Sequence, residues 1–312
     1  MKRTALVLVI LVAIAGAASL RAVVGRDGGA PKSNGAMTRT IPKAETTAAP
    51  NVPKTSRFAV PVLMYHRISD LSDKERLSPL MRDLTVSPAD FDRQVRYLVD
   101  NGFAPLLARE VEEAVINGRK LPEKSVAITM DDGYKDNFDQ AFPILQKYRV
   151  PATIFLVTNT VDTAGHLSWD DVALMHGRQV GYGSHTVHHY DLPDLSIFQI
   201  DYELRESRRV LESRLVETIS SVAYPSGRYN QTVVERARAA GYLAGWKKGG
   251  GPVQPGAEVY LLPRVRVNGG STMADFQRKV WSGANVLADR RDSEFMRMKL
   301  ARKIRQVREG GV

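Results

Sequence analysis

The feature that most constrains this sequence is a regular alternation of short apolar runs with amphipathic stretches, which begins at about Phe58. The runs Val60–Tyr65, Ser125–Met130 and Ala152–Val157 have the length and composition of buried strands. Further strands are expected at 180–184, 222–224, 242–246 and 259–267, and helices at 87–102, 138–145, 197–215 and 232–240. About seven strands that alternate with helices favour a parallel sheet, either a barrel or a doubly wound layer.

The beginning of the chain differs from this middle part. Residues 1–20 combine Lys2 and Arg3 with an uncharged run, which is typical of a signal peptide or an N-terminal anchor. Residues 21–56 are rich in Gly, Pro, Ala and Thr without apolar periodicity, and they are predicted to form a disordered tether. We therefore expect an exported protein, located in the periplasm, at the cell surface or outside the cell, with its main domain at 57–290.

The other end, residues 291–312, is predicted to form a basic helix. Its positive charges contribute to a formal net charge of +10 for the whole chain. This basic face is either simply solvated or in contact with a membrane surface or an anionic polymer. Nucleic acid is not an expected partner, because the chain is predicted to be exported.

Two adjacent carboxylates follow the strand predicted at 125–130. Asp131 and Asp132 would repel each other unless a cation or a hydrogen-bond donor lies nearby. Neighbouring residues of an extended chain point in different directions, so the two carboxylates can take different roles. Asp-Asp-Gly is also a common turn sequence, and this motif alone leaves both interpretations open.

Histidines cluster at the end of the strand predicted at 180–184. His185, His188 and His189 are three of the six histidines in the chain. In helical or turn geometry, the spacing of His185 and His189 puts both rings on one face, where they can share a metal ion. The alternative is a pair of surface histidines. The Glu of the H-E-x-x-H zinc-protease motif is missing.

The composition narrows the kind of metal site that these motifs can form. The chain has no cysteine, so disulfides and thiolate ligands are excluded. One Asp and two His form a ligand set used by hydrolytic metals that keep a position open for water. The second Asp would then be available as a base, and this combination is suited to amide or ester hydrolysis.

These motifs resemble those of the NodB-homology polysaccharide deacetylases, carbohydrate esterase family 4, and most of all the branch that acts on poly-N-acetylglucosamine in biofilm matrices. The resemblance covers roughly residues 58–280. It includes Pro61–His66, Asp131–Gly133, His185–His189, Ala223–Gly227 and Leu262–Arg264. It implies an irregular barrel of about seven β/α units, a (β/α)7 barrel related to the TIM fold.

The resemblance also implies roles for individual residues. Asp131 would be the general base, and Asp132, His185 and His189 would bind a divalent metal, with zinc favoured over cobalt, nickel or iron. The backbone amide of Ser226 would help to hold the oxyanion. Trp246 would line the acetyl pocket. The other residues expected to contact the substrate are Tyr224, Pro225, Ser226, Leu262 and Arg264.

The sequence departs from the family pattern at three positions. Ala223 stands where the family has an arginine and Tyr242 where it has an aspartate, and in the family that pair supports the base. Arg264 stands where the family has its general-acid histidine. An arginine does not give up its proton near pH 7, so we expect Arg264 to bind an anion or a sugar hydroxyl. The remaining proton donors are His66 and Asp131.

The resemblance implies an enzyme that removes N-acetyl groups from the N-acetylglucosamine units of an extracellular or cell-wall polysaccharide, with poly-N-acetylglucosamine favoured. A peptidoglycan deacetylase or an acetyl-xylan esterase would use the same site. A carbohydrate-binding pseudoenzyme is the alternative of another class. The departures from the family pattern favour it, whereas the intact Asp-Asp and His-x-x-x-His sets argue against it.

Overall fold

The computed structural model describes residues 59–281. The predicted signal or anchor at 1–20, the tether at 21–56 and the basic helix at 291–312 lie outside these residues. Between residues 59 and 281, no helix has both the length and the apolar composition that a membrane span requires.

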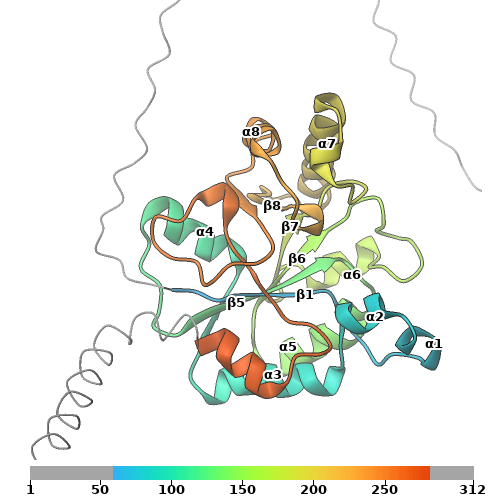
Figure 1. Cartoon of the computed structure of the whole chain (residues 1–312), viewed down its shortest axis with the longest axis vertical. Helices are drawn as coiled ribbons and strands as arrows, with labels where there is room; N and C mark the ends of the chain where they lie inside the picture. The colour runs from blue at the N-terminus through green and yellow to red at the C-terminus, as the bar shows by residue number, and fades with distance from the viewer. Residues whose placement is uncertain (1–58, 282–312) are drawn as a thin grey trace, which may run out of the picture. The chain divides into compact units, whose positions relative to one another are not determined.

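The centre of the fold is a curled sheet in which every strand pairing is parallel (Figure 1). Its strands are β1 (Val62–Tyr65), β4 (Ala104–Leu106), β5 (Ser125–Asp132), β6 (Ala152–Leu156), β7 (Val180–Ser184), β8 (Ser221–Ala223), β9 (Ala244–Trp246) and β10 (Val265–Arg266). They follow the order β10-β1-β5-β6-β7-β8-β9, and β4 pairs with the first residues of β5. Isolated bridges from Trp246 to Leu262 and from Gly249 to Arg264 connect the two ends of this order. The sheet is therefore an irregular barrel, as the family resemblance implies.

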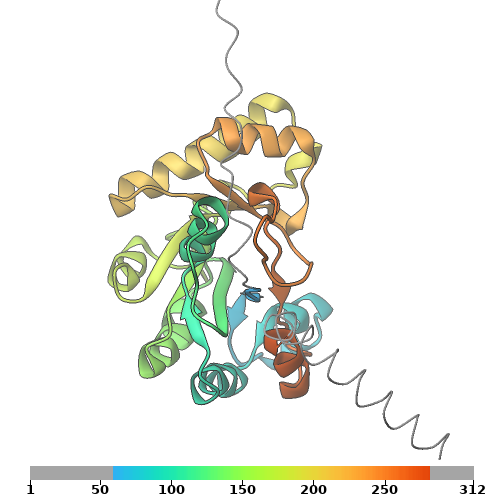
Figure 2. The same cartoon turned by 90° about the vertical axis from the view of Figure 1, so that its left-hand side faces the viewer.

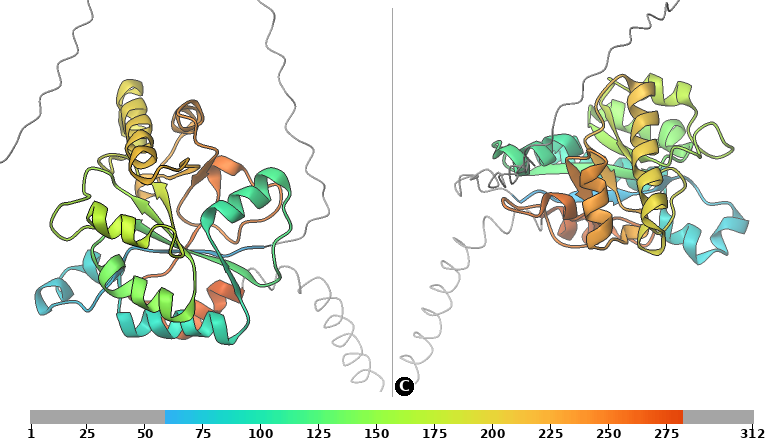
Figure 3. Two further views of the ribbon diagram at one scale, coloured as in Figure 1. Left: turned by 180° about the vertical axis from the view of Figure 1, so that it is seen from behind. Right: turned by 90° about the horizontal axis from the view of Figure 1, so that it is seen from above.

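Helices cover the outside of this sheet (Figures 2 and 3). They are α3 (Pro88–Asp100), α4 (Ala108–Asn117), α5 (Phe142–Tyr148), α6 (Trp169–Met175), α7 (Ile197–Leu215) and α8 (Gln231–Ala239). Two short helices, α1 (Asp73–Arg76) and α2 (Pro79–Leu84), lie in an excursion between β2 (Arg67–Ile68) and β3 (Thr85–Val86), which pair with each other. The α3 helix begins as its sequence predicts, because Ser87 accepts a hydrogen bond from the Asp90 amide and Pro88 occupies the first turn.

The core has two parts because successive side chains of a strand point to opposite faces. One cluster fills the barrel and includes Val62, Ala127 and Phe155. The other lies on the opposite face of the strands and includes Leu63 and Ile128. Alternation along β5 places Asp131 on the same face as Ala127, inside the barrel, whereas Asp132 ends the strand.

Most predicted elements are confirmed, and the differences have local causes. The strand at 180–184 and the helix at 197–215 have the predicted bounds. The strand predicted at 259–267 is instead a 3-10 turn, Val259–Leu261, followed by β10. Pro263 explains this break, because proline has no amide hydrogen to donate to a strand neighbour. The sequence pattern did not predict β4, α4 and α6, nor the short elements between residues 67 and 86, which are β2, α1, α2 and β3.

Candidate metal centre

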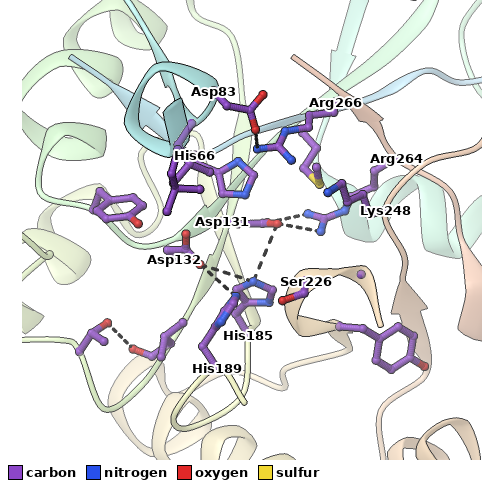
Figure 4. Close-up of a pocket in the computed structure, with 18 of the residues that line it drawn as sticks. His66, Asp83, Asp131, Asp132, His185, His189, Ser226, Lys248, Arg264 and Arg266 are labelled. Carbon is purple, nitrogen blue, oxygen red and sulfur yellow. Dashed lines mark hydrogen bonds and ion pairs between the residues drawn. The ribbon is translucent and has the colours of Figure 1, made fainter. Parts of the chain in front are cut away.

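A cavity of about 690 Å³ opens where β1, β5 and β7 end. This is the carboxyl edge of the parallel strands, where loops carry the chemistry of such barrels. Figure 4 shows the side chains that converge on it. Its wall includes His66, Asp131, Asp132, His185, His189, Tyr224, Ser226 and Arg264, all of which the sequence analysis selected.

Three of these side chains converge on a common point. Asp132, His185 and His189 each offer a ligand atom, and these atoms all lie within 4.8 Å of one another. The Asp132 Oδ1 atom is 3.5 Å from His185 Nε2 and 3.6 Å from His189 Nε2. Ligands at roughly 2.1 Å from a tetrahedral metal are separated by about 3.4 Å. The observed spacing therefore fits a small divalent cation without rearrangement of the side chains.

The backbone at Asp132 explains how this carboxylate turns toward the histidines. Asp132 and Gly133 both have a φ of 73°, in the left-handed region. A side chain at Gly133 would be strained at this φ, and its Cβ atom would lie 2.6 Å from Leu156 Cδ2, so glycine is strongly favoured there. The Asp-Asp-Gly sequence is thus both a tight turn and the source of a ligand, and the two interpretations of the motif are compatible.

The ring of His185 is held in one tautomer. Its Nδ1 atom lies 2.7 Å from the Ala223 carbonyl oxygen, which can only accept, so Nδ1 carries the hydrogen. The Nε2 lone pair then faces Asp132, as metal binding requires. Burial lowers the pKa of His185, which favours the neutral form that can act as a ligand.

Glu203 supports the loop that carries the histidines, and the sequence analysis missed it. This residue is only 2% exposed, on α7. One carboxylate oxygen accepts hydrogen bonds from the Val187 and His188 amides at 2.9 Å, and the other lies 2.6 Å from His188 Nδ1. A signal was present in the sequence, since Glu203 interrupts the apolar stripe of Ile200, Leu204 and Leu211.

Asp131 occupies a different environment from its neighbour. Arg264 donates two hydrogen bonds to its carboxylate, at 2.6 and 2.8 Å, and both side chains are almost fully buried. Burial alone would raise the pKa of Asp131, but the charges of Arg264 and His185 and the Arg264 hydrogen bonds outweigh it and lower the pKa. Asp131 is therefore ionised at neutral pH.

Arg264 has a contact that the family resemblance did not imply. Its guanidinium is bound by Asp131 and lies 5.2 Å from the centre of the Phe155 ring, so its charge is matched by a carboxylate, and binding of an anion or a sugar hydroxyl stays a prediction. The support for Asp131 is also not absent, although Ala223 and Tyr242 replace the family pair. Arg264, which immediately precedes β10, reaches the same carboxylate from across β1.

His66 lies on the cavity wall at the end of β1 (Figure 4). Its Nδ1 atom is buried and has no hydrogen-bond partner among the described residues. Burial lowers the pKa of His66 to about 4, and the nearby Asp131 charge only partly opposes this effect. The imidazole is therefore neutral near pH 7 in the free protein.

The residues expected to contact the substrate divide into two groups. Tyr224 and Ser226 line the cavity, and Ser226 has a φ of 56° that bends the chain beside His185. Pro225, Trp246 and Leu262 are not on the cavity wall. Trp246 is fully buried, and its indole nitrogen donates to Glu112 at 2.8 Å. Trp246 and Leu262 pack inside the barrel, so their positions do not support direct contact with the substrate, which stays a prediction.

The sequence is similar to those of several known proteins. A family model described as polysaccharide deacetylase matches residues 118–245. The Bacillus subtilis protein YxkH, whose name describes a polysaccharide deacetylase, is 32% identical over 72% of this chain and 77% of its own length. The poly-β-1,6-N-acetyl-D-glucosamine N-deacetylase of Staphylococcus epidermidis is 26% identical over 74% of this chain and 88% of its own length.

A similar fold occurs among solved structures. The Streptococcus pyogenes deacetylase PplD in complex with acetate superimposes with a TM-score of 0.68 and 29% identity. The alignment covers 72% of this chain and 99% of that protein. A polysaccharide deacetylase from Bacillus cereus gives a TM-score of 0.64 and 29% identity, over 72% of this chain and 69% of its own.

Proposed function

The chain belongs to the polysaccharide deacetylase family and is a deacetylase of the hydrolase class, and from this premise we propose its substrate and mechanism. It acts outside the cytoplasm and removes acetyl groups from N-acetylglucosamine units of a polysaccharide. The convergence of Asp132, His185 and His189 beside an ionised Asp131 is the observation that carries this proposal. The signal-like residues 1–20 support export.

Poly-N-acetylglucosamine is the favoured polymer. The support is the similarity to the staphylococcal enzyme named for that substrate, which extends over most of both chains. Peptidoglycan and acetyl-xylan would meet the same catalytic groups and are the other substrates to test. One argument for the pseudoenzyme alternative is weakened, because Arg264 supports Asp131 in place of the missing family pair, whereas the family's acid histidine is still absent.

Three side chains would hold the divalent metal, with zinc favoured. Asp132 supplies an oxygen ligand and His185 and His189 supply nitrogen ligands, within 4.8 Å of one another. When bound, such a cation supplies Lewis acidity toward a carbonyl oxygen and a water molecule. The Ala223 carbonyl fixes the His185 tautomer, and Glu203 fixes the backbone that precedes His189.

Asp131 acts as the general base. Its carboxylate stays ionised because Arg264 holds its pKa low, so it can accept the proton of the attacking water. The two Arg264 hydrogen bonds also fix the direction of the carboxylate. The backbone amide of Ser226, on the cavity wall, donates a hydrogen bond to the oxyanion that develops on the acetyl group.

The leaving amine needs a proton, and two groups can provide it. Asp131 carries the proton of the attacking water after the first step. His66 lies on the same wall, but its low pKa means that it must gain a proton before it can donate one. We propose His66 as the donor, because its ring lies on the cavity wall near Asp131.

An amide and an activated ester distinguish the two donors. If His66 is the acid, His66→Ala should lower the rate on an N-acetyl substrate by about 10²-fold or more, since general acid catalysis contributes at least that much. The same variant should affect an acetyl ester of a good leaving group much less. Equal and small effects on both substrates would assign both proton transfers to Asp131.

The proposed function is tested by acetate release from a panel of polymers. The full-length protein is assayed on poly-N-acetylglucosamine, peptidoglycan and acetyl-xylan, with and without a chelator and after addition of zinc. We expect chelation to abolish acetate release and zinc to restore it, with the highest kcat/KM on poly-N-acetylglucosamine. Activity that survives complete metal removal would refute the metal-dependent mechanism.

A further inference from the structure

Three parallel aromatic rings extend outward from the cavity. The His188 ring stacks on Tyr190, with a centroid distance of 5.2 Å and an interplanar angle of 17°. It also stacks on Tyr202, at 6.2 Å and 21°. We call His188, Tyr190 and Tyr202 the aromatic ladder. His188 lies within the His185–His189 motif, but none of the three residues is assigned as a metal ligand or as the base.

The His188 ring, on which both tyrosines stack, is held in position by Glu203. Glu203 lies 2.6 Å from His188 Nδ1 and also accepts the His188 backbone amide. Tyr202 precedes Glu203 on α7, so the helix that anchors the His188 ring also carries one of the rings stacked on it. A preorganised surface of this kind loses little conformational entropy when it binds a ligand.

The ladder joins the cavity to an exposed apolar surface. His188 lines the cavity, whereas Tyr190 and Tyr202 are 53% and 50% exposed. Phe198, one helical turn before Tyr202 on α7, is 82% exposed. Exposed apolar surface that continues from a ligand cavity is typical of an extended binding site.

We propose that the aromatic ladder is a binding subsite for sugar units that flank the unit being deacetylated. A pyranose ring has an apolar face of C–H groups that packs on an aromatic ring, and its hydroxyls can pair with tyrosine hydroxyls. A second stacked pair, Tyr134 and His166, lines the same cavity and offers a similar aromatic surface. The centroids of its two rings are 5.2 Å apart. This inference rests on the proposed function, because it assumes a polymeric carbohydrate in the cavity.

The test compares a long and a short substrate. The variant Tyr190→Ala/Tyr202→Ala removes the two outer rings and leaves His188 and Glu203 intact. Zinc-loaded full-length protein is assayed on the monomer and the pentamer of β-linked N-acetylglucosamine. We expect the pentamer-to-monomer ratio of kcat/KM to fall about tenfold in this variant.

A matched control removes exposed apolar surface at the other edge of the sheet. Leu243, just before the amino end of β9, is 54% exposed. Leu243→Ala should keep the wild-type ratio. An unchanged pentamer-to-monomer ratio in the tyrosine variant would overturn the proposal. If that variant also loses binding to anionic lipid vesicles, the ladder is a membrane-docking surface instead.

Direct binding separates this proposal from the proposed function. Pentamer affinity is measured by calorimetry in Asp131→Asn protein, with and without the two tyrosine changes. We expect about tenfold weaker binding without the tyrosines. If the wild type releases no acetate but the tyrosines still strengthen pentamer binding, the proposed function fails and the subsite stands. If acetate is released and the affinity does not change, the subsite fails and the function stands.

Discussion

The two sides of the cavity are organised differently, although β5 contributes to both. On the base side, Asp131 is buried and its charge is matched by Arg264. On the ligand side, Asp132 is partly exposed and faces the rings of His185 and His189. Strand alternation and the left-handed turn at Asp132 direct the two neighbouring carboxylates to these different surroundings.

The supports of the two sides also differ in their distance along the chain. Arg264 is 133 residues from Asp131 and reaches it through the order of the sheet. Glu203 is 15 residues from His188 and reaches it through a single helix that follows the loop. The base therefore depends on the whole barrel being assembled, whereas the ligand loop depends on the docking of α7. The following experiments test this difference.

The largest effect is expected from separating the two carboxylates. Asp131→Asn should lower kcat about 10²–10⁴-fold, because it removes the general base, while the metal content stays that of the wild type. Asp132→Ala, His185→Ala and His189→Ala should each lose both metal and activity. Metal analysis and turnover kinetics on the same samples decide the matter. Loss of metal in Asp131→Asn would mean that the two aspartates have exchanged roles.

Replacement of Arg264 should affect both the stability of the protein and the pKa of Asp131. In Arg264→Met, Asp131 becomes a buried carboxylate without a partner, and the free energy of unfolding should fall by about 3–5 kcal/mol. Burial then raises the pKa of Asp131 without opposition from Arg264. The base is ionised only at higher pH, so the acidic limb of the kcat/KM profile should move to higher pH.

Two measurements distinguish this role from substrate binding by Arg264. Denaturant unfolding should show that the double variant Arg264→Met/Asp131→Asn recovers part of the lost stability, because no unpaired buried charge remains. If Arg264 bound only the substrate, Arg264→Met would raise KM without changing the stability or the acidic limb.

A smaller effect is expected on the ligand side. Glu203→Gln keeps the shape of the side chain but replaces one carboxylate oxygen with an NH2 group, which cannot accept the hydrogen bonds of this loop. Metal affinity should fall about tenfold, as is common when the support of a ligand is changed. Competition with a chromogenic chelator measures this affinity without any substrate.

The control for Glu203 lies one turn further along the same helix. Glu206 pairs with Arg209 at the surface of α7 and makes no described contact with the histidine loop. Glu206→Gln should keep the wild-type metal affinity. If both variants bind the metal as the wild type does, Glu203 contributes to folding alone.

The smallest effect on catalysis is expected below the cavity, at Trp246. Trp246→Phe removes the indole N–H that donates to Glu112 and should cost about 1–3 kcal/mol in stability, because a buried acceptor loses a partner. KM and kcat on the polymer should change little, since Trp246 is fully buried and lies off the cavity wall. Kinetics at matched metal content test this expectation. A large rise in KM would restore the sequence-based assignment of Trp246 to the acetyl pocket.

The sequence by itself determined the elements that local periodicity encodes. Apolar runs of strand length located β5, β6 and β7, and the 3.6-residue period located α7 within its observed bounds. It also selected the pair of Asp131 and Asp132 together with His185 and His189, because few side chains bind metals and the carboxyl ends of parallel strands share one edge, while the family resemblance assigned Asp132 to the metal. These conclusions depend on residue chemistry and on neighbours in the chain.

The tertiary structure alone decided which distant side chains meet. The Arg264–Asp131 pair, the Glu203 support and the burial of Trp246 depend on strand order, register and packing between segments far apart in the sequence. An arginine in a motif has the same local pattern whether it faces a substrate or a buried carboxylate. Only the closed sheet, which brings β10 beside β1 and close to the end of β5, distinguishes these two environments.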